Sequence, residues 1–74
     1  MYSLSSLLRT FLYSEPYIWA DVFLLKETQK AILIEFDGKA TWLPKAWIAK
    51  IRQGKINSAI KIKISLYHWS QKFD

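Results

Sequence analysis

The side chains best suited to contact another molecule are basic, and they concentrate in the second half of the chain. Residues 1–38 have a net charge of −2, from three basic and five acidic side chains, whereas residues 39–74 reach +7, from eight basic and one acidic. Seven of those eight basic residues are lysines, which suit contact with phosphate groups better than bidentate reading of base edges. Such a field attracts polyanions or an acidic protein surface, although lysines also keep apolar domains soluble.

Two segments carry basic side chains at alternate positions, which is the spacing of one face of a β-strand. Isoleucines at 60, 62 and 64 alternate with Lys61 and Lys63. In the segment 47–52, Lys50 and Arg52 are two residues apart, so in a strand their side chains point to the same face. If these segments pair as a hairpin with isoleucines inward, the four basic side chains share the outer face. We therefore expect a surface that contacts phosphates and stacks aromatic rings on unpaired bases. The residues expected to line the phosphates are Lys50, Arg52, Lys61 and Lys63. Lys45 and Lys55 are expected at the rim, and Trp47 or Tyr67 is expected to offer the stacking surface.

The sequence contains no arrangement typical of a catalytic or metal site. It has no cysteine and a single histidine, His68, so a metal site built from several His or Cys ligands would need a second chain. Glu35 and Asp37 are close in sequence, but a turn accounts for Asp37 and no general base accompanies them. Gly38 and Gly54 are isolated turn residues and form no phosphate-binding loop. We expect a protein that is not an enzyme and that uses no cofactor or metal ion.

The elements that must position these residues are short strands within one small domain. The 74 residues suffice for a single hydrophobic core, and the 51% hydrophobic content argues against disorder. Alternation and β-branched residues predict five strands, joined by local connections. Their expected ranges are 18–26, 30–36, 39–43, 47–52 and 60–64.

The fold class expected from this order is mainly β, a five-stranded antiparallel barrel of the SH3-like or OB-like kind with a short helix at each end. The barrel is assigned to residues 17–64 of a single domain spanning 1–74. Ser65 is expected to cap a C-terminal helix over 65–73, whose Leu66, Trp69 and Phe73 fall on one face and cover an open end of the sheet.

An amphipathic helix is expected at the N-terminus, over residues 1–15. Its apolar stripe is predicted to pack on the barrel, to bind a partner or to support an oligomer. The segment is too short to span a bilayer and lacks the features of a secretory signal, so we expect a cytoplasmic protein with no membrane span. The stripe consists of Leu4, Leu7, Leu8 and Phe11.

The turn at Asp37-Gly38 decides where Trp42 points. A two-residue turn pairs Phe36 with Lys39 and puts Trp42 opposite Leu33, whereas a three-residue loop puts Trp42 opposite a buried isoleucine at 32. The three-residue loop is favoured because it also pairs Glu35 with Lys39 across the strands, and it predicts a largely buried Trp42. For tryptophans in general, core packing and base stacking both stay open.

Two stretches of the chain resemble a small, largely uncharacterised family of bacteria, phages and mobile elements, with a KAxLVxxDGxxxWLPKSxI core. They are KAILIEFDGKATWLPKAWI at 30–48 and the strand-to-helix segment 60–73, and Asp37-Gly38, Trp42-Leu43-Pro44-Lys45 and Trp69 are the most specific pieces. Ala46 stands where the pattern has Ser, Leu66 stands near its usual Pro, and residues 1–16 have no counterpart. The resemblance implies a small β-barrel, often encoded beside nucleic-acid machinery, and implies no activity.

Two functions are compatible with these features. The first is a module that binds RNA or single-stranded DNA mainly through lysine–phosphate contacts, with limited sequence specificity. The second is an accessory or inhibitory protein-interaction subunit of a larger phage or mobile-element nucleoprotein complex. Its cationic face would dock on an acidic patch or mimic a contact, and the N-terminal stripe would insert in a groove of a partner.

Overall fold

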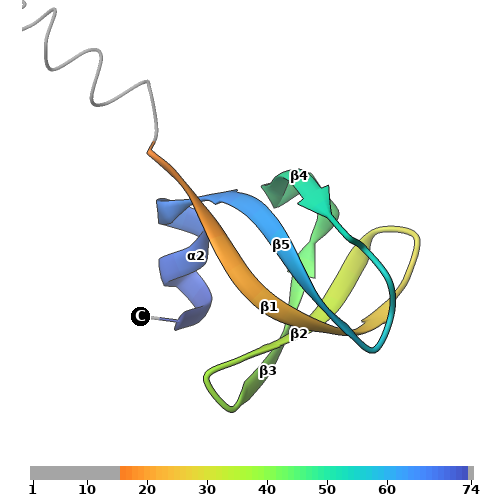
Figure 1. Ribbon diagram of the computed structural model, residues 1–74. Helices are drawn as coiled ribbons and strands as arrows, with labels where there is room; N and C mark the ends of the chain where they lie inside the picture. The colour runs from red at the N-terminus through yellow and green to blue at the C-terminus, as the bar shows by residue number, and fades with distance from the viewer. Residues whose placement is uncertain (1–15, 74) are drawn as a thin grey trace, which may run out of the picture.

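The computed structural model describes residues 16–73, and within them five strands form one antiparallel sheet (Figure 1). Helix α2 (Leu66–Phe73) follows the last strand, and a 3-10 turn, η1 (Lys45–Trp47), separates the third and fourth strands. The predicted strands and the C-terminal helix are confirmed, with ends shifted by up to two residues. The expected N-terminal helix and its apolar stripe lie outside the described residues. The strands are β1 (Tyr17–Glu27), β2 (Ala31–Phe36), β3 (Lys39–Pro44), β4 (Ile48–Arg52) and β5 (Ser58–Ser65).

The sheet is open, so the expected closed barrel is wrong. The strand order is β3-β2-β1-β5-β4, with the long strand β1 in the centre, paired to β2 on one side and to β5 on the other. Among the described residues no ladder joins the edge strands β3 and β4. Pro44, which has no amide hydrogen, ends β3, and the chain then turns through η1 before β4 begins. Direct continuation of the ladder from β3 to β4 is therefore interrupted.

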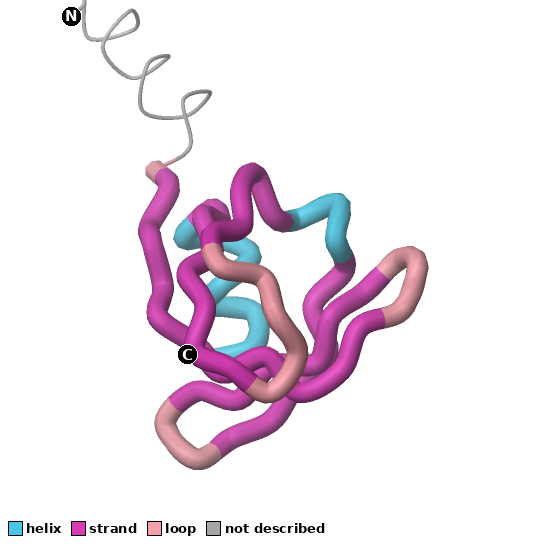
Figure 2. Tube along the Cα trace, turned by 45° about the vertical axis from the view of Figure 1, so that its right-hand side comes forward, coloured by secondary structure: helices cyan, strands magenta, loops and turns pink. Residues whose placement is uncertain are grey.

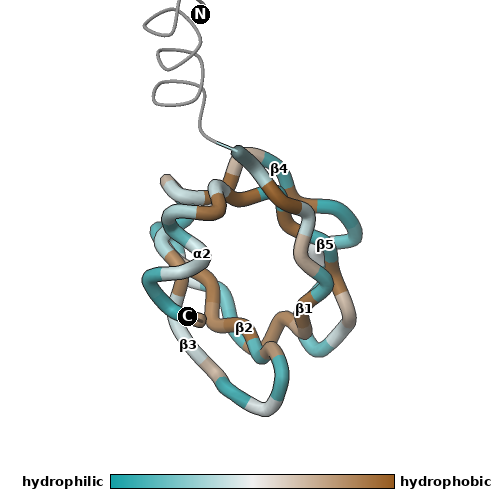
Figure 3. Tube along the Cα trace, turned by 90° about the vertical axis from the view of Figure 1, so that its left-hand side faces the viewer, coloured by the Kyte–Doolittle hydropathy of each residue, from teal (hydrophilic) through white to brown (hydrophobic). Residues whose placement is uncertain are grey.

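The sheet is nevertheless strongly curled. A flat five-stranded sheet would separate its edge strands by roughly 19 Å, four spacings of about 4.8 Å. Only the three residues of η1 connect β3 to β4, and a 3-10 turn of that length rises roughly 6 Å. The ends of the two edge strands must therefore approach each other, and the strands bend around a common interior (Figures 2 and 3).

Side chains from the inner face of the curled sheet fill this interior, and α2 covers one end of it. The indole of Trp69 on α2 is 9% exposed and meets the ring of Phe36 edge-on, with 4.9 Å between ring centroids. Phe73 stacks on Trp69 at 4.3 Å, so the helix contributes its apolar face to the core as predicted. The buried hydrophobic residues are Ala20, Val22, Leu24, Ile32, Ile34, Leu43, Ile60, Ile62, Ile64 and Trp69.

Ser65 caps α2 as predicted. Its Oγ accepts a hydrogen bond from the backbone N–H of His68 at 3.1 Å, which satisfies one of the free donors of the first turn. Leu66 differs from expectation, because in this first turn its side chain is exposed and only Trp69 and Phe73 enter the core. Within residues 16–73, no helix has the length and apolar content needed to cross a membrane.

The β2–β3 hairpin has a two-residue turn, so the favoured three-residue loop is wrong. Phe36 pairs with Lys39, and both turn residues, Asp37 and Gly38, have positive φ angles of 54° and 79°. Positive φ at both positions is the type I′ turn, whose twist matches that of the strands. This fit outweighs the Glu35–Lys39 charge pair, since an exposed cross-strand pair contributes only about 0.2–1 kcal/mol. Trp42 therefore points outward and is 42% exposed, not buried.

Candidate functional site

The candidate site is the outer face of the β4–β5 hairpin. The register pairs Lys50 with Lys63 and Arg52 with Lys61, while Ile62 between them is completely buried. The predicted sharing of one face by these four side chains is confirmed, and we refer to them as the basic face. Alternation along β5 causes this, because burying every second isoleucine turns both intervening lysines outward.

A β-bulge in β4 is needed to form the basic face. Ile48 pairs with Ile64, but the next pair is Lys50 with Lys63, so two steps along β4 match one step along β5 and Ala49 is the extra residue. Strict alternation would place Ile48 on the same face as Lys50. The bulge instead lets Ile48 pack against the core while Lys50 points outward.

The outer face of β1 continues the basic face on the other side of β5. Trp19 lies opposite Lys63, and Asp21 lies opposite Lys61. Tyr17 and Trp19 are 50% and 43% exposed, and sequence reasoning missed both as members of this site. The alternation of side chains along β1 could have identified them. Tyr17 and Trp19 alternate with side chains that pack in the core, namely Ile18, Ala20, Val22 and Leu24.

Both aromatic rings contact cations of the basic face. The guanidinium of Arg52 lies over the indole of Trp19, with 4.6 Å between its central carbon and the ring centroid. The ammonium of Lys63 lies 5.8 Å from the ring centroid of Tyr17. These distances are within the range of attraction between a cation and an aromatic face.

The electrostatics of the basic face are unbalanced. Like charges lie directly opposite each other in two cross-strand pairs on the same face, an arrangement that destabilises a sheet. Among the described residues, Asp21 is the acidic side chain whose register places it beside these cations, and its carboxylate lies 3.0 Å from Lys61. Both partners are largely exposed, at 53% and 76% for their side chains, so solvent screens this ion pair and it holds Lys61 weakly. The face keeps an excess of positive charge.

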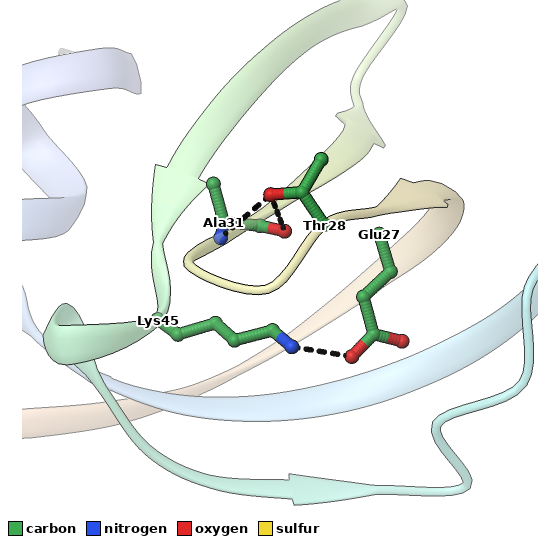
Figure 4. A network of polar contacts seen from close by, with 4 residues as sticks. All are labelled: Glu27, Thr28, Ala31 and Lys45. Carbon is green, nitrogen blue, oxygen red and sulfur yellow. Dashed lines mark hydrogen bonds and ion pairs between the residues drawn. The ribbon is translucent and has the colours of Figure 1, made fainter.

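Lys45, predicted to lie at the rim of this site, points elsewhere. Its ammonium forms an ion pair with Glu27 at 2.5 Å, beside the β1–β2 turn (Figure 4). The turn is held by Thr28, whose backbone N–H donates to the carbonyl of Ala31 at 2.8 Å and whose Oγ1 accepts from the N–H of Ala31 at 3.1 Å. The backbone N–H of Lys45 also donates to Lys30 at 2.7 Å, so this residue anchors η1 to the turn.

Lys55, also predicted for the rim, lies in the loop between β4 and β5. Its carbonyl accepts a hydrogen bond from Ser58 Oγ at 2.5 Å, and its N–H donates to Gln53 at 2.8 Å. This local bonding ties the loop to the start of β5. Lys55 therefore lies at the end of the hairpin that carries the basic face.

The two aromatic residues predicted for stacking lie in η1 and in α2, and both contact His68. Trp47 stacks on His68, with ring centroids 4.4 Å apart and planes 7° from parallel, and it also packs against the core. Tyr67 is 59% exposed and meets His68 edge-on at 5.4 Å. His68 therefore covers one face of Trp47, and the rings that contact the basic face are those of Tyr17 and Trp19.

The described part of the chain contains no cluster of three or more His, Asp or Glu side chains that could hold a metal ion. Ser65 Oγ lies 3.1 Å from His68 Nδ1, but this contact belongs to the helix cap. Ser65 is 1% exposed, so its hydroxyl is out of reach of a substrate.

Comparisons of the chain with protein-family models, with curated proteins and with solved structures find no match in any of the three. The family resemblance stays a prediction. The basic face is therefore the feature of this chain that points to a function.

Proposed function

We propose that this protein is a non-enzymatic module that binds single-stranded nucleic acid, RNA or single-stranded DNA, across the basic face. The observation that carries the proposal is the register of β4 and β5, which puts four cations side by side on adjacent strands. Nothing in the sheet itself requires this arrangement, since cross-strand repulsion lowers stability. A phosphate backbone laid over the face would neutralise the repulsion and release its own counterions.

The chemistry of these side chains also limits the kind of recognition. Three of the four cations are lysines, which contact phosphates as point charges, and phosphate contacts carry no sequence information directly. The expected binding is therefore strongly dependent on salt and only weakly dependent on sequence.

A salt titration tests the proposal. The probe is a labelled oligouridylate or oligothymidylate of about twelve nucleotides, within the usual range of single-strand site sizes, and binding is followed by fluorescence anisotropy. Four phosphate contacts predict that the logarithm of the association constant falls with the logarithm of salt concentration with a slope of about −3. The K50A and K63A variants should each reduce the size of that slope by about 0.7.

The matched control is K30A, which removes an exposed lysine from the β1–β2 turn, outside the basic face. This variant should keep the wild-type slope. Absence of binding at low salt, or an affinity that does not change with salt, would contradict the proposal.

The second candidate function, a protein-interaction subunit of a nucleoprotein complex, would use the cationic face together with the N-terminal stripe of Leu4, Leu7, Leu8 and Phe11. The stripe lies outside the described part of the chain, and that function stays a prediction.

A further inference from the structure

Two aromatic rings of β1 lie exposed beside the basic face, and one of them is covered by an arginine. We infer that Trp19 and Tyr17 are the base-stacking platform of this protein, and that Arg52 leaves the Trp19 ring for a phosphate when a base stacks there. This inference depends on the proposed function and adds to it the ligand chemistry, namely unpaired bases as well as phosphates.

The first step is that the core does not account for these rings. The inner side of β1 is filled by Ala20, Val22 and Leu24, none more than 6% exposed, whereas Trp19 and Tyr17 are 43% and 50% exposed. Trp69 shows the contrasting arrangement, a tryptophan that is 9% exposed and packed on its neighbours. Exposed aromatic rings beside a groove or face of positive charge are what proteins use to stack successive unpaired bases.

The second step is that Arg52 is held on Trp19 by the ring itself. Arg52 is on β4 and Trp19 is on β1, and β5 lies between these two strands. The side chain of Arg52 therefore crosses β5, and the two outer strands of this group are roughly 9.6 Å apart. Along the way it passes Lys61, its cross-strand partner, which repels it. Among the described residues no carboxylate lies within ion-pair distance of the guanidinium. Its position therefore depends on an exposed cation–π contact, which is weak.

The third step is the exchange of partners. A base that stacks on Trp19 must displace the guanidinium, and the phosphate attached to that nucleotide offers the guanidinium a bidentate, charge-assisted hydrogen bond. Tyr17 lies two residues along the same strand, about 6.8 Å away, with Lys63 beside its ring, so the arrangement of ring and cation is repeated. A base pair within a duplex cannot use either ring, because its faces are already stacked on neighbouring pairs.

Substitution of Trp19 separates base stacking from phosphate binding. The probes are oligothymidylate, oligouridylate and a DNA hairpin that is closed by a non-nucleotide linker and has the same number of phosphates, each measured by anisotropy over a series of salt concentrations. The wild type should bind both single strands more tightly than the hairpin. W19L should lose roughly 5- to 150-fold in affinity for the single strands, the contribution of one stacked base, and keep its affinity for the hairpin and its salt slope.

Two further variants control for structure. Trp42 on β3 has nearly the same exposure as Trp19, 42% against 43%, but lies outside the basic face, so W42L should bind like the wild type. W19Y keeps an aromatic ring and should keep most of the single-strand affinity. The indole N–H signal of Trp19 in the NMR spectrum can be assigned by its absence from W19L. In the wild type this signal should shift when oligothymidylate is added, whereas that of buried Trp69 should not.

The outcomes distinguish the two proposals. If W19L binds single strands like the wild type, or if hairpin and single strands bind equally, the stacking platform is refuted while salt-dependent phosphate binding stands. If the wild type binds none of the probes at low salt, the proposed function fails and the stacking platform fails with it.

Discussion

At the scale of the residue, the most informative feature is a pair of like charges placed opposite each other. Lys50 and Lys63 form one cross-strand pair, and the neighbouring pair, Arg52 and Lys61, has the same sign. One carboxylate, that of Asp21, lies beside them and is largely exposed. Residues selected only for stability of the sheet would alternate in charge across the strands. The proposed binding of an anion would account for a basic face that lowers the stability of the sheet.

Reversing one charge of the basic face should raise stability and lower affinity together. In K50E, a carboxylate faces the ammonium of Lys63, so the free energy of unfolding should rise by roughly 0.2–1 kcal/mol. Affinity for oligothymidylate should fall, because one phosphate contact becomes a repulsion. Urea denaturation and fluorescence anisotropy measure the two effects. A variant that is less stable than the wild type, or that binds equally well, would show that Lys50 has another role.

At the scale of the element, turns and one bulge decide which side chains point outward. The two-residue turn at Asp37-Gly38 puts Trp42 on the outer face, and the bulge at Ala49 lets Ile48 face inward while Lys50 faces outward. Each is a local conformation that shifts the side-chain alternation of a whole strand. The basic face and the exposed tryptophan on β3 therefore both depend on backbone geometry at a few positions.

The G38A substitution tests the turn. Gly38 has a φ of +79°, a conformation that an L side chain rarely adopts, although no atom lies within 4 Å of the position of an added Cβ. The expected loss is about 1–2 kcal/mol in the free energy of unfolding, from backbone strain alone. G54A is the matched control, since Gly54 lacks a positive φ and an added Cβ meets only the exposed side chain of Ile51, at 3.1 Å. Equal losses in the two variants would contradict this account of the hairpin.

At the scale of the whole molecule, α2 covers one end of the curled sheet. The cluster of Phe36, Trp69 and Phe73 joins the helix to the β2–β3 hairpin through edge-on and stacked ring contacts. A chain of this length has a total stability of roughly 4–11 kcal/mol. The aromatic cluster is therefore a large part of what keeps the fold together.

The two tryptophans Trp69 and Trp42 should differ sharply in their contribution to stability. W69A removes a buried indole and should lower the free energy of unfolding by about 3–5 kcal/mol. W42A removes an exposed indole and should change it by about 1 kcal/mol or less. Thermal and urea denaturation compare the variants. A small loss in W69A would mean that α2 contributes little to the core.

Patterns within a few residues of each other predicted most of the elements. Alternation in β5 placed Lys61 and Lys63 on the outer face, and Ser65 marked the start of α2, because each signal depends on neighbours along the chain. The choice between two turn lengths at Asp37-Gly38 was wrong, since a weak charge pair was preferred to the intrinsic fit of the turn. The placement of Lys45 at the rim of the basic face overlooked Glu27, which is distant in sequence but adjacent in the fold.

The sequence by itself determined the strands, the hairpin at Asp37-Gly38 and the alternation that turns the lysines of β5 outward. These features depend on the pleat of a strand and on the geometry of a turn, which are set by residues close together in the sequence. Only the tertiary structure decided that β1 lies beside β5, which brings Trp19 and Tyr17 to the cations, and that the sheet curls without closing. The physical reason is that pairing between the first and last strands follows from the burial summed over the whole sheet. A pattern within a few residues cannot predict this pairing, because the total apolar surface buried depends on residues far apart in the sequence.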